Sequence, residues 1–136
     1  MSTADLARKV IAVATALEPL THLPEIRSIS AFNTEFLIRL KTDYDPWLKF
    51  EPLSQWAYAF NAPIEIALDY GTSADVNARF EMAGHQVCVT ERMNSAHAYQ
   101  LGAELQTPFA QGQPLQMTAA KLQELIHKFA VQAATS

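Results

Sequence analysis

The strongest constraint on the fold comes from three consecutive runs in the middle of the chain in which apolar and polar residues alternate. They cover residues 64–70, 76–82 and 86–91. Successive side chains of a strand point to opposite faces, so each run predicts a half-buried strand. Gly71 and Gly84 stand between the runs, and such short turn sequences predict hairpins rather than helical crossovers.

Two shorter alternating runs nearer the N-terminus predict another hairpin, over residues 25–41 with its turn at Asn33-Thr34. Residues 47–50 are expected to add one short strand. Apolar residues that recur every three or four positions predict four helices. These helices cover residues 3–18, 52–60, 95–106 and the segment from 118 onward.

This order of elements predicts an α+β fold, because strands joined as hairpins form antiparallel sheets whose helices gather on one face. We expect an antiparallel sheet of about five strands. An N-terminal helix, a short middle helix and two C-terminal helices would pack mainly on one face of it. The chain has 136 residues, 49% of them apolar, and no linker-like segment, so it is expected to form a single globular domain over residues 1–136.

Charge and hydropathy narrow the expected partners. The net charge is −4 and no basic run is present, so direct nucleic-acid binding is not expected. No apolar run approaches the roughly 18 residues of a membrane span, and Asp5 interrupts what would be the basic region of a signal peptide. The single cysteine cannot form an internal disulfide. We therefore expect a cytoplasmic protein without a membrane association.

Common catalytic and cofactor motifs are missing from the sequence. The four glycines are at least ten residues apart, so neither a dinucleotide-binding G-x-G-x-x-G motif nor a P-loop can be written. The nucleophile elbow, the H-E-x-x-H zinc motif, C-x-x-C and the EF-hand loop are also missing. We expect no cofactor and no metal site.

His85 and Cys88 lie close together in the sequence and first suggest a metal or thiol site. Residues three apart on a strand point to opposite faces, so this pair is expected to be separated by the sheet. The simpler interpretation is a hairpin that turns at Gly84, with Phe80 and Met82 on the core side. The roles of Cys88 and of the four histidines remain open.

The segment from 43 to 60 is unusually rich in aromatic residues, and acidic residues accompany them. Exposed aromatic side chains beside carboxylates are typical of contact surfaces, although Trp47 and Tyr58 would equally suit the edge of the core. The candidate contact residues for a partner or ligand are Tyr44, Trp47, Tyr58, Asp43 and Asp45.

Three functions are compatible with these observations. The first is a small acidic, non-enzymatic interaction protein, an accessory, adaptor or inhibitor that binds another macromolecule, most simply another protein. The second is a small-molecule binding domain for an apolar ligand, with a pocket between sheet and helices lined by Phe36, Trp56, Phe80 and Met82, and also by Trp47. The third is a small enzyme that uses a histidine, His97 or His85, with nearby carboxylates. A homodimer stays open beside all three, because small sheets often pair their edges.

Overall fold

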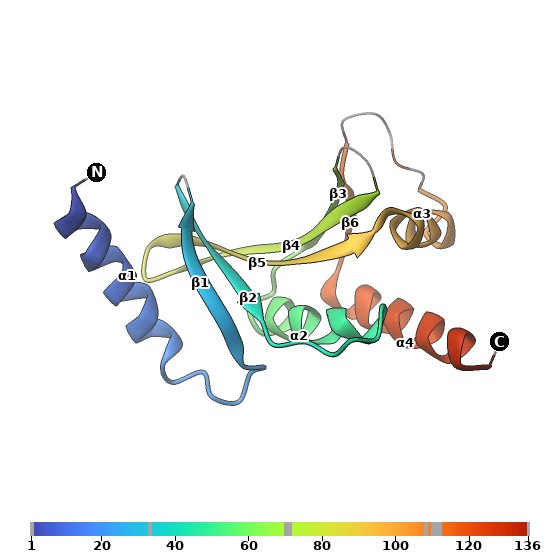
Figure 1. Ribbon diagram of the computed structural model, residues 1–136, viewed down its shortest axis with the longest axis horizontal. Coiled ribbons are helices and arrows are strands. Elements are labelled where there is room, and N and C mark those ends of the chain that lie inside the picture. Colours follow the sequence, from blue (N-terminus) through green and yellow to red (C-terminus); the bar gives the residue numbers. More distant parts are fainter. Residues whose placement is uncertain (1, 33, 70–71, 108, 110–112, 136) are drawn as a thin grey trace.

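The computed structural model describes residues 2–32, 34–69, 72–107, 109 and 113–135, which form four α-helices and one six-stranded mixed sheet (Figure 1). In chain order the elements are α1 (Thr3–Leu17), β1 (Ile26–Phe32), β2 (Glu35–Leu40), the 3-10 helix η1 (Leu48–Phe50), α2 (Glu51–Ala59), β3 (Ile64–Leu68), β4 (Ser73–Met82), β5 (His85–Asn94), α3 (Ser95–Glu104), β6 (Leu115–Met117) and α4 (Ala119–Thr135). The α+β class and the four helices are confirmed.

The sheet is mixed, so the prediction of a wholly antiparallel sheet is wrong in one pairing. The strand order is β1-β2-β5-β4-β3-β6, and β2 lies parallel to β5 while every other pair is antiparallel. In the parallel pair, Phe36 lies opposite Val87 and Ile38 opposite Val89. The N-terminal hairpin and the central strands thereby become one sheet.

The β4–β5 hairpin follows directly from the alternation seen in the sequence. Its ladder runs without a break from Ser73 opposite Asn94 to Met82 opposite His85. The two residues of the turn, Ala83 and Gly84, have φ angles of 53° and 76°. Positive φ at both central positions is the type I′ geometry, whose twist matches that of two-residue hairpins.

Two helices cover one face of this sheet. Figure 1 shows α2 and α4 on the same side of the strands, where they enclose the apolar side chains. Trp56 of α2 is fully buried, and its indole N–H donates to the backbone oxygen of Pro24 at 2.9 Å. The rings of Phe60 and Phe80 stack with their centroids 4.1 Å apart.

Two short segments differ from the prediction. Residues 48–50 form a 3-10 helix instead of a strand, because the Asp45 carboxylate accepts hydrogen bonds from the backbone N–H groups of Trp47 and Leu48, both at 2.8 Å. Residues 115–117, for which no element was predicted, form the edge strand β6 beside β3. Tyr70 and Gly71, predicted to end a strand and begin a turn, lie outside the described residues.

The N-terminal helix stands apart from the helical layer. In Figure 1, α1 lies beside β1 at one end of the sheet, away from α4 at the other end. Val13 is its single buried residue. Within the described ranges, no helix has the length and hydropathy needed to cross a membrane.

Candidate functional site

Trp47 does not lie on the surface, so of its two interpretations the one as a contact residue is wrong and the one as a core residue holds. Only 4% of its surface is accessible, and its ring packs against His97 at a centroid distance of 4.5 Å and against Phe129 at 4.8 Å. The turn held by Asp45 directs the side chain inward. Trp47 is therefore a core residue that joins the start of η1 to α3 and α4.

The other contact candidates are exposed, but nothing in the structure gathers them into one patch. Tyr44 is fully exposed, and its backbone N–H donates to the Asp43 carboxylate at 2.7 Å. The two backbone hydrogen bonds to Asp45 lower the pKa of its carboxyl group. Both carboxylates thus serve the local turn. Tyr58, 68% exposed, lies on α2.

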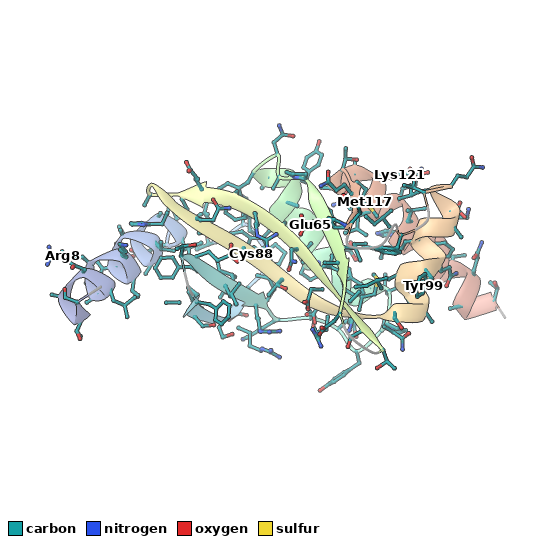
Figure 2. All side chains as sticks on the ribbon, turned by 90° about the horizontal axis from the view of Figure 1, so that it is seen from above. Arg8, Glu65, Cys88, Tyr99, Met117 and Lys121 are labelled. Carbon is teal, nitrogen blue, oxygen red and sulfur yellow. The ribbon has the colours of Figure 1, made fainter. Side chains whose placement is uncertain are left out.

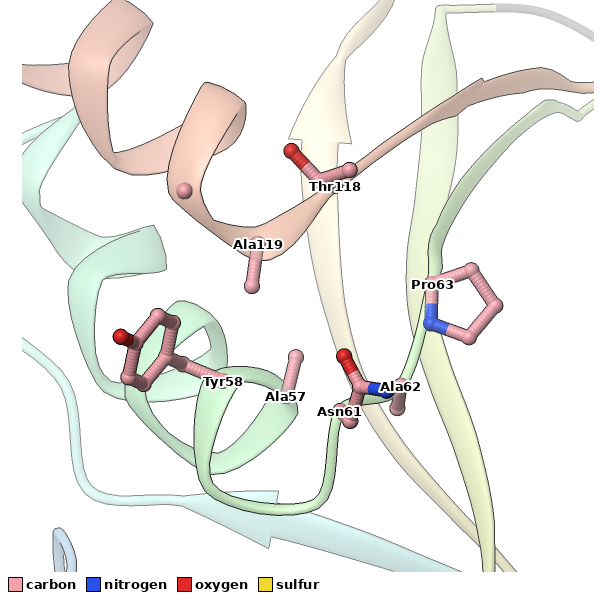
Figure 3. A pocket seen from close by; sticks show the side chains of 8 residues that line it. Ala57, Tyr58, Asn61, Ala62, Pro63, Thr118 and Ala119 are labelled. Carbon is pink, nitrogen blue, oxygen red and sulfur yellow. The ribbon is translucent and has the colours of Figure 1, made fainter.

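Tyr58 borders a groove between the end of α2 and the start of α4, with a volume of 610 Å³ (Figure 3). The floor is made of small side chains, among them Ala57, Ala62 and Ala119. Its shape comes from the α2 terminus, where the amide of Ala62 donates to the oxygen of Ala57 around a left-handed Asn61, with φ 51°. This pattern is the Schellman cap. The described residues that line the groove include no charged side chain.

The predicted pocket-lining residues belong instead to the packed core. Phe36, Trp56, Phe80 and Met82 are all buried. Phe80 stacks on Phe60 as described, and Phe36 meets the ring of His85 edge-on at 6.1 Å. Phe36 also lines a hollow of 130 Å³ under α1, and Trp56 lines one of 450 Å³ beside the α1–β1 connection. The main role of these four side chains is therefore to pack the core.

The histidines supply little of what an acid–base site requires. Burial of His97, and then the positive charge of Lys49, lower the pKa of its imidazole. One histidine–carboxylate contact occurs in the described part of the chain, between His127 and Glu51 at 3.6 Å on the exposed surface. The same residues contain no group of three side chains that could hold a metal ion.

The opposite face of the sheet carries polar and charged side chains, and Figure 2 looks onto it. Cys88 points to this face and His85 to the helical face, so the predicted separation of the two residues is confirmed. The guanidinium of Arg79 makes ion pairs with Glu35 at 3.3 Å and Glu65 at 3.1 Å. Cys88 lies buried beneath this network.

Five of the ten large apolar side chains that are exposed among the described residues lie at the α1 end of the molecule. We name this group the α1–β1 surface and define it by Leu6, Val10 and Ile11 of α1 with Ile29 and Phe32 of β1. These five side chains are between 38% and 63% exposed. Every residue of β1 after Ile26 is exposed, so the edge strand is uncovered.

Sequence reasoning missed this surface because an apolar stripe on a helix normally faces a core. Two signals were nevertheless present. Ile11 falls off the stripe that contains Val10 and Val13, and Ala31-Phe32 places apolar residues on both faces of a strand. Both patterns indicate more apolar surface than one core face can bury.

Comparisons with protein-family models, with curated proteins and with solved structures found no match. The function is therefore inferred from the fold and its surfaces alone.

Proposed function

We propose that the protein is a non-enzymatic interaction protein that binds another macromolecule through the α1–β1 surface. The observation that carries this proposal is α1 itself. The helix is fifteen residues long, yet it buries one side chain and leaves Leu6, Val10 and Ile11 exposed. Isolated helices of this length are marginal in water, so a partner that covers these residues would stabilise the helix.

The chemistry elsewhere agrees with a binding role. The carboxylates of the 43–45 segment bond to backbone amides, and the Arg79 ion pairs lie on an open sheet face. Exposed apolar side chains on a helix and on both faces of an uncovered edge strand are, by contrast, typical of a protein-binding surface.

The test compares two sets of substitutions in a pull-down from the native host. One variant carries Val10→Ser, Ile29→Ser and Phe32→Ser, and the matched control carries Tyr44→Ser, Tyr99→Ser and Val131→Ser at other exposed apolar positions. We expect a protein that the wild type and the control retain, and that the first variant loses. The captured protein must then bind again from purified components. Equal retention by both variants would contradict the proposal.

A second candidate function rests on the groove of Figure 3, whose volume and apolar floor would accommodate a small ligand. Filling the floor by Ala57→Leu together with Ala119→Leu should abolish binding of such a ligand. The fluorescence of a hydrophobic dye such as anilinonaphthalene sulfonate, compared between the wild type and this variant, measures the loss of binding.

A further inference from the structure

The free edge of β1 offers backbone hydrogen-bonding groups as well as apolar side chains. The amide of Lys41 donates to the oxygen of Glu25 at 2.9 Å. Backbone groups of an antiparallel strand face its partner at every second residue. The residues of β2 whose N–H and C=O groups face β1 are therefore every second residue before Lys41, namely Arg39, Leu37 and Glu35.

The residues opposite these three are Ser28, Ser30 and Phe32. Ile29 and Ala31 lie between them, so their N–H and C=O groups point away from β2, toward the uncovered edge. β1 contains neither proline nor an acidic residue. Natural edge strands commonly use charge or proline to block pairing, and Arg27 is the one charged residue on this strand.

The N-terminal part of the chain, which contains this edge, has a net positive charge, whereas the rest of the chain has a net negative charge. Residues 1–41 contain five basic and four acidic side chains, whereas residues 42–136 contain five basic and ten acidic ones. Three cations at this end, Lys9, Arg27 and Arg39, make no ion pair with any residue that the structure describes.

The acids of the same region are mostly neutralised already. Asp5 pairs with Arg8, Glu25 with Lys41 and Glu35 with Arg79. Lys9 lines the hollow between α1 and the hairpin, together with Leu6 and Ala31. The uncovered edge is therefore bordered by unpaired positive charge on α1, β1 and β2.

We infer that the occupant of this edge is an extended segment of another protein, in which apolar residues alternate with acidic ones, added as a seventh strand beside β1. This inference rests on the proposed function and specifies its partner. Strand addition supplies affinity through the main chain and specificity through alternate side chains. Successive residues of a strand point to opposite faces, so the apolar residues of the segment cover Ile29 and the exposed part of α1 on one face, and its acidic residues lie on the other face, where Arg39 stands opposite Ser28.

A second copy of the chain fits this edge less well, because self-pairing brings two positively charged edges together. In an antiparallel self-pairing centred on Ile29, each Arg27 faces Ala31 of the other copy and finds no carboxylate there. Electrostatic complementarity selects partners chiefly by penalising such juxtapositions. An acidic segment removes the repulsion.

The test uses the full chain and fluorescein-labelled nine-residue peptides in which isoleucine alternates with glutamate or, as a matched probe, with lysine. We expect the glutamate peptide to bind about tenfold or more tightly than the lysine peptide in fluorescence anisotropy. The backbone amides of Ile29 and Ala31 should gain hydrogen-exchange protection in the complex. Equal binding of the two peptides, or protection confined to another element, overturns the inference.

Two sets of variants locate the binding on the edge. Ala31→Pro removes an outward-facing N–H at an edge position, where proline is tolerated. This variant should abolish binding of the peptide. Ala31→Thr keeps the N–H donor and should bind the peptide as the wild type does. The double variant Arg27→Glu with Arg39→Glu should reverse the peptide preference, and Lys121→Glu on the distant α4 should not. The charge-reversal arm decides the question if the proline variant unfolds.

The outcomes separate this inference from the proposed function. If the peptides do not bind but the pull-down partner is still lost with the α1–β1 substitutions, the acidic strand is wrong and the interaction surface stands. If light scattering shows a dimer that Ala31→Pro dissociates, a second copy is the occupant and the inference is overturned. If neither peptides nor pull-down respond, both proposals fail.

Discussion

Arg79 stands directly opposite Cys88 in the β4–β5 ladder, and the ion pairs of Arg79 to Glu35 and Glu65 extend over the strands on either side. The thiol is 1% exposed. Burial raises the pKa of Cys88 to about 11, although the positive charge of Arg79 acts in the opposite direction. The network thus shields a cysteine that is held in its neutral form.

We predict that the native thiol reacts slowly. The thiolate is the reactive form, and a pKa near 11 leaves about a hundredth of the thiolate present at an ordinary pKa of 9.0. Native protein at pH 8 should therefore react with Ellman's reagent at least about a hundredfold more slowly than protein in 6 M guanidinium chloride. Comparable rates in the two conditions would contradict this prediction.

The same pKa shift predicts a loss of stability at alkaline pH. The folded state favours the neutral thiol, so its contribution is complete below pH 9 and is lost as pH rises from about 9 to about 11. The free energy of unfolding should fall by roughly 2–3 kcal/mol over this range. Urea unfolding of the wild type and of Cys88→Ala isolates this contribution, because the variant should lose less stability over the same pH interval.

The β4–β5 turn is expected to improve when its first residue is changed. Ala83 has a φ angle of 53°, a conformation that strains residues with a Cβ and is tolerated best by glycine and asparagine. Ala83→Asn should raise the free energy of unfolding by about 0.5–1 kcal/mol. Ala83→Val, which adds a branch at the strained position, should lower it; if both substitutions act in the same direction, the turn geometry is wrong.

Trp47 and Tyr44 should respond in opposite ways to truncation. Trp47→Ala removes a buried ring from its stacks with His97 and Phe129 and should cost about 3–5 kcal/mol. Tyr44→Ala removes a fully exposed ring and should change stability by less than about 0.5 kcal/mol. Thermal unfolding followed by circular dichroism distinguishes them, and Trp47→Phe should recover part of the loss.

Asp45 should make the start of η1 sensitive to acid. Its carboxylate accepts two backbone hydrogen bonds, which lower its pKa in the folded state. The stabilisation is present above the pKa of the unfolded chain, near 3.9, and is lost as pH falls through the folded value. Asp45→Ala should lower the urea midpoint at pH 7, and the difference from the wild type should shrink at pH 2–3. A constant difference would show that the charge plays no part.

The sequence allowed the strands to be located more securely than their partners. Alternation between residues 64 and 91 predicted β3, β4 and β5 because it depends only on which face is buried. The parallel pairing of β2 with β5 has no local signal, since it depends on which exposed edge meets which. The strand β6 is three residues long, too short for a period of two to be recognised.

The candidate residues show the same limit. Aromatic side chains are common both in cores and at contact surfaces, and only the tertiary packing shows which of the two a given residue belongs to. Trp47 is buried because Asp45 turns the chain inward at that point, whereas Tyr58 borders the open groove of Figure 3 and stays 68% exposed. The stripe on α1 was recognised as apolar, but its lack of a covering element depends on the tertiary arrangement.

The parallel pair also sets an order of assembly. Phe36 meets Val87 across a separation of about fifty residues, and closing such a loop costs about 3–4 kcal/mol of chain entropy before any contact is gained. During synthesis, the N-terminal hairpin leaves the ribosome long before its partner strand exists. Until β5 emerges, the edge of β2 that will pair with it stays unpaired, so the hairpin must wait for the central strands before the sheet is complete.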